Sequence, residues 1–180
     1  MKKKISKFIL RLMGWKIGTV IPDEPKCVIC VAPHTSNWDF IIGKLFYDAL
    51  GRQSNFLIKK EWFFFPFNIF FKSIGGVPVE RGRRTSVTDA MAKEFATRDR
   101  FQLAITPEGT RKAVKEWKRG FYYIATKANV PIALTYLDYG KKEAGIMKLF
   151  YPTGNEEQDI AAIRACYKGI KGKNADQFVE

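Results

Sequence analysis

The sequence predicts a single α/β domain in which helices flank one β-sheet. Short apolar runs of strand composition alternate along the chain with segments whose apolar residues recur at helical spacing. No Pro-, Gly- or Ser-rich linker and no internal repeat interrupts the 180 residues, a length that suits one domain. With 46% hydrophobic and 27% charged residues, the composition is that of a globular protein able to bury a core.

The chain begins with a basic, amphipathic segment. Four large apolar residues share one face of a predicted helix: Ile5, Phe8, Ile9 and Leu12. The basic residues lie largely on the other faces, which is typical of a helix in the plane of a membrane interface. We therefore expect residues 1–22 to attach reversibly to an anionic membrane surface and residues 23–180 to form the α/β domain. The alternative is a helix that packs its apolar face on the domain.

The first predicted strand, residues 27–32, is followed by the only histidine in the sequence. Ser36 is a good helix N-cap and Asp39 lies three residues later, at the capping-box position, so we expect a helix to begin here. From the first turn, the Asp39 carboxylate can accept a hydrogen bond from one ring nitrogen of His34 and leave the other nitrogen free as a base. The alternative is that Asp39 only caps the helix and His34 is an ordinary loop residue.

An aromatic segment, residues 62–71, comes next and is preceded by two lysines. It falls short of the ~18 to 20 apolar residues that a membrane-spanning helix needs, and Pro66 and Asn68 interrupt it. We expect it to form a membrane-facing lip, the wall of an apolar groove, or part of the core. Lys60 is a candidate for contacting a substrate phosphate, or it is a solvated charge at the end of a strand.

Two more apolar runs end in residues suited to binding an anion. Residues 75–79 lead to Arg81. Residues 101–105 lead to the turn 106–111, which reads Thr-Pro-Glu-Gly-Thr-Arg. Backbone amides in such a turn form a concave anion site, its glycine permits close approach, and its arginine matches phosphate geometry. Because ligands of open α/β sheets collect at the carboxyl ends of strands, we expect the three strand ends to share one crevice.

The remaining segments supply further helices and strands. Helical spacing predicts helices over residues 85–98 and 117–127 and near residues 160–170, and apolar runs predict a strand over residues 131–136 and an edge strand over residues 146–151. We expect the apolar face of the last helix to cover the sheet rather than to bind a partner.

The three cysteines argue against a metal site and against a disulfide framework. Cys27 and Cys30 have the spacing of a thiol-redox or zinc motif. Cys166 and His34 would complete four nominal zinc ligands. In an extended strand, however, residues three apart point to opposite faces, so the first two cysteines cannot converge. We expect buried thiols, no metal, and a reducing compartment.

Taken in order, these motifs resemble those of the glycerolipid acyltransferases, the family that includes 1-acylglycerol-3-phosphate acyltransferase. Residues 34–39 are similar to the catalytic His-x4-Asp block, and residues 75–81 to the block that ends in a phosphate-binding arginine. Residues 107–111 are similar to the Pro-Glu-Gly-Thr-Arg block, and residues 130–132 to the fourth block. The resemblance spans residues 27–138, and four blocks in order are far more specific than a single motif.

The resemblance implies a mixed, mostly parallel sheet and an O-acyltransferase. His34 would take the proton from a hydroxyl of a glycerol-phosphate lipid, with 1-acylglycerol-3-phosphate as the expected acceptor, while Asp39 orients the ring. The acyl thioester, on acyl-carrier protein or coenzyme A, is a co-substrate, so no cofactor is expected. The resemblance assigns substrate binding to Arg81, Glu108, Gly109, Thr110 and Arg111. Of these, Glu108 would accept a bond from a glycerol hydroxyl, hold an arginine, or serve the structure alone.

The net charge of +13 indicates anionic partners. Such a surface attracts phospholipid headgroups, acidic carrier proteins or nucleic acid. Together with the amphipathic segment and the resemblance, it predicts a cytoplasmic enzyme of phospholipid biosynthesis that is peripheral on the inner face of the cell membrane. Two alternatives remain. One is a nucleic-acid-binding module, for which the sequence has no helix-turn-helix, zinc-finger or RNP signature. The other is a lipid-binding relative without catalytic activity.

Overall fold

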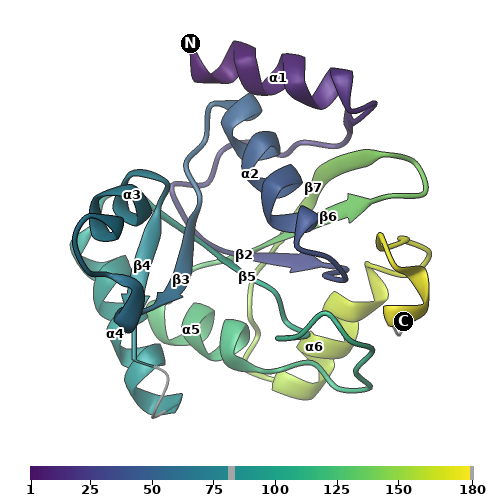
Figure 1. Cartoon of the computed structure of the whole chain (residues 1–180). Coiled ribbons are helices and arrows are strands. Elements are labelled where there is room, and N and C mark those ends of the chain that lie inside the picture. The colour runs from purple at the N-terminus through teal and green to yellow at the C-terminus, as the bar shows by residue number, and fades with distance from the viewer. Residues whose placement is uncertain (81–83, 179–180) are drawn as a thin grey trace.

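A seven-stranded β-sheet forms the centre of the structure, and helices cover both of its faces (Figure 1). The structure is a computed structural model that describes residues 1–80 and 84–178, with the backbone alone for residues 84–86. The strand order is β1-β7-β6-β2-β5-β3-β4, and only the β6–β7 pair is antiparallel. The predicted α/β fold with a mixed, mostly parallel sheet is therefore confirmed. The strands are β1 (Lys16–Ile17), β2 (Lys26–Ala32), β3 (Asn55–Lys59), β4 (Gly76–Val79), β5 (Phe101–Ile105), β6 (Ile132–Asp138) and β7 (Glu143–Phe150).

Strand β7 differs from the predicted edge strand over residues 146–151. It begins at Glu143, and its outer side pairs with β1, where Lys16 lies opposite Glu143. The expectation of an edge strand was therefore wrong. A strand of two residues carries no periodicity of its own, so nothing in the sequence indicated β1.

The helices divide between the two faces of the sheet (Figure 1). They are α1 (Lys2–Leu12), α2 (Trp38–Leu50), α3 (Phe67–Ser73), α4 (Arg84–Thr97), α5 (Gly120–Ala128) and α6 (Glu156–Ala165). Helices α1 and α2 bury Leu10 and Phe46 in the core of one face, whereas α4, α5 and α6 form the core of the other. The last helix covers the sheet as expected, since Ile163 is fully buried there. Helix α5 begins three residues later than predicted.

Side chains of the central strand β2 alternate between these two cores. Val28 and Cys30 belong to the core under α4, α5 and α6, and Cys27 and Ile29 to the core under α1 and α2. The two cysteines therefore point to opposite faces, as predicted, and both are free and buried. Burial raises the pKa of the Cys27 thiol to about 12.

Helix α1 exposes its apolar face. Ile5, Phe8 and Leu12 are 52%, 62% and 71% exposed, whereas Ser6 and Leu10 are buried against the domain. The alternative that the apolar face packs on the domain is therefore wrong. The helix docks on α2 through its more polar side, because the buried stripe contains a serine small enough for close approach and only one leucine.

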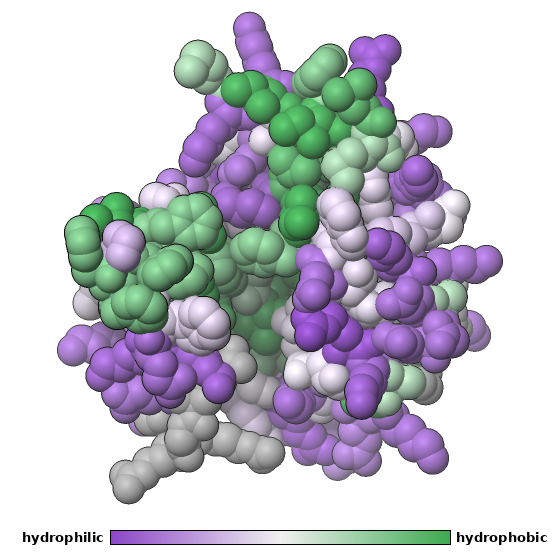
Figure 2. All heavy atoms as spheres, in the orientation of Figure 1, coloured by the Kyte–Doolittle hydropathy of each residue, from purple (hydrophilic) through white to green (hydrophobic). Residues whose placement is uncertain are grey.

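The aromatic segment, residues 62–71, is also exposed. The large apolar side chains that are more than half exposed here are Trp62, Phe64, Phe65, Ile69 and Phe70. The alternative that it belongs to the core is wrong. Figure 2 shows apolar side chains gathered on one face over α1 and over α3, with the surface hollowed between them. Within residues 1–80 and 84–178, no helix is both long and apolar enough to cross a membrane.

Candidate active site

Parallel pairing brings two of the predicted motifs together at one edge of the sheet. Strands β2 and β5 are neighbours in register, with Cys30 opposite Ile105, so the loops that follow them emerge side by side. The loop after β2 carries His34, and the loop after β5 is the turn 106–111. Strand β4 lies two positions farther along, beyond β3. Arg81, predicted to follow β4, lies outside the described residues.

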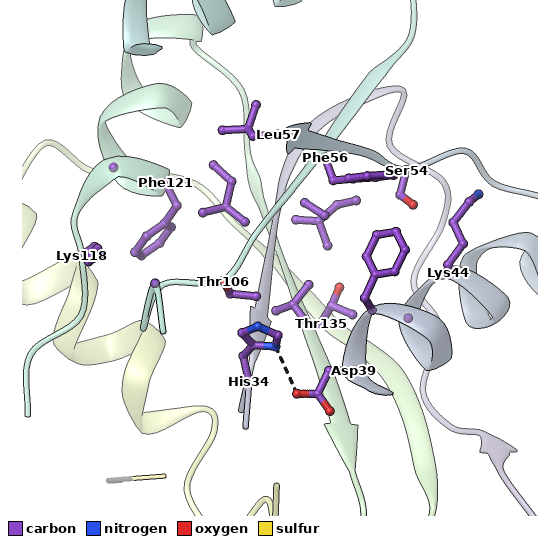
Figure 3. A pocket seen from close by; sticks show the side chains of 18 of the residues that line it. His34, Asp39, Lys44, Ser54, Phe56, Leu57, Thr106, Lys118, Phe121 and Thr135 are labelled. Atoms are coloured by element: carbon purple, nitrogen blue, oxygen red, sulfur yellow. Dashed lines mark hydrogen bonds and ion pairs between the residues drawn. The ribbon is translucent and has the colours of Figure 1, made fainter. Parts of the chain in front are cut away.

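His34 and Asp39 form the predicted pair. The Nδ1 atom of His34 lies 3.1 Å from Oδ2 of Asp39 (Figure 3). A carboxylate can only accept hydrogen bonds, so the Nδ1 nitrogen carries a proton, and in the neutral form of the ring Nε2 then has the lone pair. The His34 side chain is 19% exposed and lines a cavity, whereas Asp39 is buried. No described side chain hydrogen-bonds Nε2, which leaves this nitrogen available to a ligand.

Four hydrogen-bond donors, His34 included, hold the Asp39 carboxylate. Its Oδ2 atom accepts hydrogen bonds from the backbone N–H groups of Thr35 and Ser36, each at 2.8 Å, and its Oδ1 atom accepts one from Tyr139 at 2.7 Å. Burial alone would raise the pKa of Asp39, but the hydrogen bonds, that of His34 foremost, outweigh burial and hold the pKa below its ordinary value. Asp39 therefore stays ionised and orients the histidine from the first turn of α2, whose N-cap is Asn37 and not the predicted Ser36.

Glu108 holds the backbone of the catalytic loop. Its carboxylate accepts from the backbone N–H of His34, with distances of 2.8 Å to Oε2 and 3.2 Å to Oε1. The side chain is 4% exposed and is not among the residues that line the cavity. Burial raises the pKa of Glu108 to about 7. Of the three roles expected for Glu108, the structure therefore supports the structural one.

The rest of the turn places positive charge beside His34. Arg111 lines the same cavity, and its Nη1 atom donates a hydrogen bond to Oδ1 of Asn37 in the histidine loop. Gly109 adopts a φ of 64°, and a Cβ there would meet the side chain of Lys118, which also lines the cavity. A glycine is thus required for the lysine to lie across the turn. Thr110 is not among the lining residues; its Oγ1 atom accepts from the backbone N–H of residue 112 at 3.3 Å.

Lys60 is not brought to the histidine. Its Nζ atom lies 2.5 Å from Oε1 of Glu80, and both side chains are more than half exposed. The two residues border a second hollow, which shares Val79 and Val87 with the cavity of His34. Lys60 is therefore near that cavity but does not line it.

The cavity beside His34 has a volume of about 610 Å³, within the range of small-molecule sites. Strands β3 and β5 pair over only two positions, Asn55 with Leu103 and Phe56 with Ala104. Beyond the second pair the ladder ends, and the next residue of each strand, Leu57 and Ile105, lines the cavity. Figure 3 shows His34 at one end of the cavity with apolar side chains beyond it. These apolar side chains include Phe40, Phe56, Leu57, Phe121 and Ile124. The cavity thus joins a polar, basic end to an apolar interior.

This arrangement suits base catalysis on an amphipathic ligand. An imidazole, oriented by an ionised carboxylate, faces a space lined by Arg111 and Lys118 and continued by hydrocarbon. In residues 1–80 and 84–178, no group of three or more His, Cys, Asp or Glu side chains lies close enough to hold a metal ion.

Three residues of the site were not predicted from the sequence. Lys118 stands in a basic run after the turn and could have been suspected from it. Asn37 lies inside the histidine motif, but nothing in the motif indicates its contact with Arg111. Tyr139 is separated by a hundred residues from the carboxylate it contacts, so no local pattern points to it.

Comparisons with known proteins agree with the geometry. The family model described as Acyltransferase matches residues 18–135. Among solved structures, the chain is similar to that of the 1-acyl-sn-glycerophosphate (LPA) acyltransferase PlsC from Thermotoga maritima, with a TM-score of 0.62 and 19% sequence identity. That match covers 93% of this chain and 76% of the other and shows a shared fold. A search among curated proteins gave no match. Because the family model covers well over half of the sequence, the chain belongs to the acyltransferase family.

Proposed function

We propose that this protein transfers a fatty acyl chain from an acyl thioester to a hydroxyl of 1-acylglycerol-3-phosphate (lysophosphatidate) in phospholipid biosynthesis. One observation carries the proposal: the free Nε2 of His34 faces a cavity whose basic residues suit a phosphate and whose interior suits hydrocarbon. The similarity to an enzyme whose title names this acceptor supports it. The donor is a thioester of coenzyme A or of acyl-carrier protein, since either is acidic and suits a chain of net charge +13.

In the proposed reaction, His34 acts first as a base and then as an acid. Its Nε2 atom takes the proton of the acceptor hydroxyl while that oxygen forms a bond to the thioester carbonyl carbon. The carbon–sulfur bond then breaks, and the departing thiolate takes the proton from Nε2. Asp39 holds Nδ1–H throughout and stabilises the transient imidazolium. No acyl-enzyme forms, and no cofactor takes part.

The proposed phosphate site lies at the turn 106–111. Arg111 is placed by Asn37, three residues from the histidine, and the side chain of Lys118 lies over Gly109. A guanidinium fork and a lysine suit a phosphate monoester better than a diester, because the monoester carries more charge. Gly109 and Thr110 contribute the turn itself. Arg81 remains a candidate for the same phosphate from the resemblance alone.

We further propose that the enzyme works on an anionic membrane. The exposed faces of α1 and of the aromatic segment lie on either side of a hollow on one face of the protein (Figure 2). Each large apolar side chain that enters a bilayer contributes about 1.5 to 3 kcal/mol before ordering costs, and basic residues add about 1 kcal/mol each near an anionic leaflet. The inner leaflet of the cell membrane is the proposed site, because its surface potential is negative.

An acyl-transfer assay tests the chemistry. Purified protein on anionic vesicles receives labelled acyl-coenzyme A or acyl-carrier protein and one of three acceptors: lysophosphatidate, lysophosphatidylglycerol or lysophosphatidylethanolamine. We expect the lysophosphatidate product to dominate. Arg111→Ala should raise the KM for lysophosphatidate about tenfold or more, because a charged hydrogen bond to the phosphate is lost. Lys112→Ala removes the same charge from the next, exposed position and is the matched control.

Three outcomes would contradict the proposal. Preference for an acceptor without a phosphate monoester would refute the assignment of the acceptor. Lipid binding without transfer would identify a non-catalytic relative, and tight nucleic-acid binding without transfer would identify a nucleic-acid module.

Vesicle flotation tests the membrane surface. Replacing Phe8 and Leu12 of α1 together by serine should reduce vesicle binding about tenfold or more, since both side chains are exposed. Tyr151→Ser changes a residue that is 66% exposed outside both patches and serves as the control. Equal flotation of all three proteins would show that α1 does not hold the membrane.

A further inference from the structure

We infer that Tyr139 is a positioning residue of the His34–Asp39 pair and that Trp15, just after α1, holds Tyr139 in place. The inference rests on the proposed function, because it assigns a role in the reaction that His34 is proposed to catalyse. Tyr139 lies outside residues 18–135, which the family model matches, and outside the sequence motifs that resemble those of the glycerolipid acyltransferases.

The first argument is the geometry around the carboxylate. His34 and two backbone N–H groups contact Oδ2 of Asp39, whereas the Tyr139 hydroxyl donates to Oδ1 at 2.7 Å. Rotation of the carboxylate about its own axis would break the tyrosine bond and displace Oδ2 from the imidazole. A donor on the second oxygen therefore fixes the angle at which Asp39 meets His34.

The second argument is the chemistry of the donor. Burial and the neighbouring Asp39 raise the pKa of Tyr139 far above its ordinary value. The hydroxyl therefore keeps its proton at any working pH, and its hydrogen bond stabilises the ionised form of Asp39. Among the described residues, the titratable groups that face Asp39 are His34 from the loop after β2, Tyr139 from just after β6, and Glu108 from the turn after β5. Only the first of these shares the reacting proton.

The third argument is the support of Tyr139 itself. Its backbone N–H donates to the carbonyl of Lys171 at 2.8 Å. Its ring meets the ring of Trp15 edge to face, with centroids 4.8 Å apart and planes at 88°. Trp15 is 7% exposed and donates its backbone N–H to the carbonyl of Leu10 in α1 at 2.8 Å. The orientation of the catalytic pair is thus connected, through two aromatic rings, to the helix proposed to lie on the membrane.

The variant Tyr139→Phe tests the role, because it keeps the ring and its contact with Trp15 and removes only the donor. We expect kcat to fall about tenfold with little change in KM, and the acid limb of the pH–rate profile to move to higher pH. The limb moves upward because a carboxylate with one donor fewer attracts the imidazolium proton more strongly. Tyr151→Phe, at an exposed tyrosine on the surface, is the matched control and should behave as wild type.

A second measurement does not depend on activity. His34 is the only histidine in the chain, so its ring gives a single, unambiguous signal in an NMR titration. Tyr139→Phe should move the midpoint of that titration to higher pH, and Trp15→Ala should move it less. Trp15→Phe keeps an aromatic edge and should titrate as wild type.

The outcomes separate this inference from the proposed function. If Tyr139→Phe leaves both kcat and the titration midpoint of His34 unchanged, Tyr139 is not a positioning residue. A fall in kcat without any movement of the midpoint or the acid limb would show a merely structural role and also overturn the inference. If the wild-type protein transfers no acyl chain, the proposed function fails, and the NMR midpoint alone decides whether Tyr139 governs the pair.

Discussion

The variant Glu108→Gln should remove a loss of stability that the wild-type protein suffers as the pH rises. Burial raises the pKa of Glu108 from 4.5 to about 7, while its carboxylate accepts the N–H of His34. Between these two pH values the folded protein binds a proton at Glu108 that the unfolded chain has already lost. Stability therefore falls as pH rises through this window, and the loss is complete above about pH 7. Glutamine keeps an oxygen that can accept from His34 and does not titrate.

The magnitude follows from the two pKa values. Their separation corresponds to about 3 kcal/mol in the free energy of unfolding. Because the side chain is only 4% exposed, solvent screens little of this effect.

Urea unfolding at a series of pH values from 5 to 8 measures this difference. We expect the stability of Glu108→Gln relative to wild type to rise by about 2.5 kcal/mol between pH 5 and pH 8, because the window begins above the unfolded-state pKa. Glu157→Gln, at an exposed position of α6, is the control and should follow the wild-type curve. A difference between Glu108→Gln and wild type that is constant with pH would refute the reasoning about burial.

Three further predictions follow from the cavity and its surroundings. Gly43 lines the cavity in mid-helix, and a Cβ there would meet no atom within 4 Å. Gly43→Ala should therefore stabilise the protein by about 0.5 to 1 kcal/mol in thermal or urea unfolding. Gly43→Leu would fill part of the cavity and should shift donor preference toward shorter acyl chains in a competition assay. An unchanged preference would show that the acyl chain lies elsewhere. Lys60→Ala should change the KM for lysophosphatidate less than about twofold, because Lys60 pairs with Glu80 outside the cavity; a tenfold rise would place the phosphate there. Cys166 should react with a thiol reagent well before Cys27 or Cys30 in the native protein, since burial raises the pKa of both strand thiols; equal rates would contradict their burial.

The sequence predicted the parts of the site whose residues lie close together along the chain or follow neighbouring parallel strands. The contact of His34 with Asp39 could be foreseen because only five residues and the start of a helix separate them, which places the carboxylate in the first turn beside the histidine loop. The neighbouring positions of β2 and β5 could be inferred because parallel strands present their carboxyl ends at one edge.

Contacts between distant segments could not be foreseen in this way. The hydrogen bond from Tyr139 to Asp39 depends on the order of strands in the sheet, which the sequence analysis did not derive. The role of Glu108 was likewise open, since a carboxylate in a turn can face a ligand or the backbone, and only the packing of β2 against β5 selects the backbone of His34. The orientation of α1 also follows from packing, because amphipathicity alone does not say whether an apolar face meets a domain or a membrane.

The central claim is that Nε2 of His34 removes the proton of the acceptor hydroxyl. Its most direct test is the single-turnover rate of acyl transfer to lysophosphatidate by His34→Ala, measured beside wild type on the same vesicles. We predict a rate about 10² to 10⁴ times lower, with the free energy of unfolding and vesicle binding close to wild type. A His34→Ala protein that transfers the acyl chain within about tenfold of the wild-type rate would contradict the mechanism.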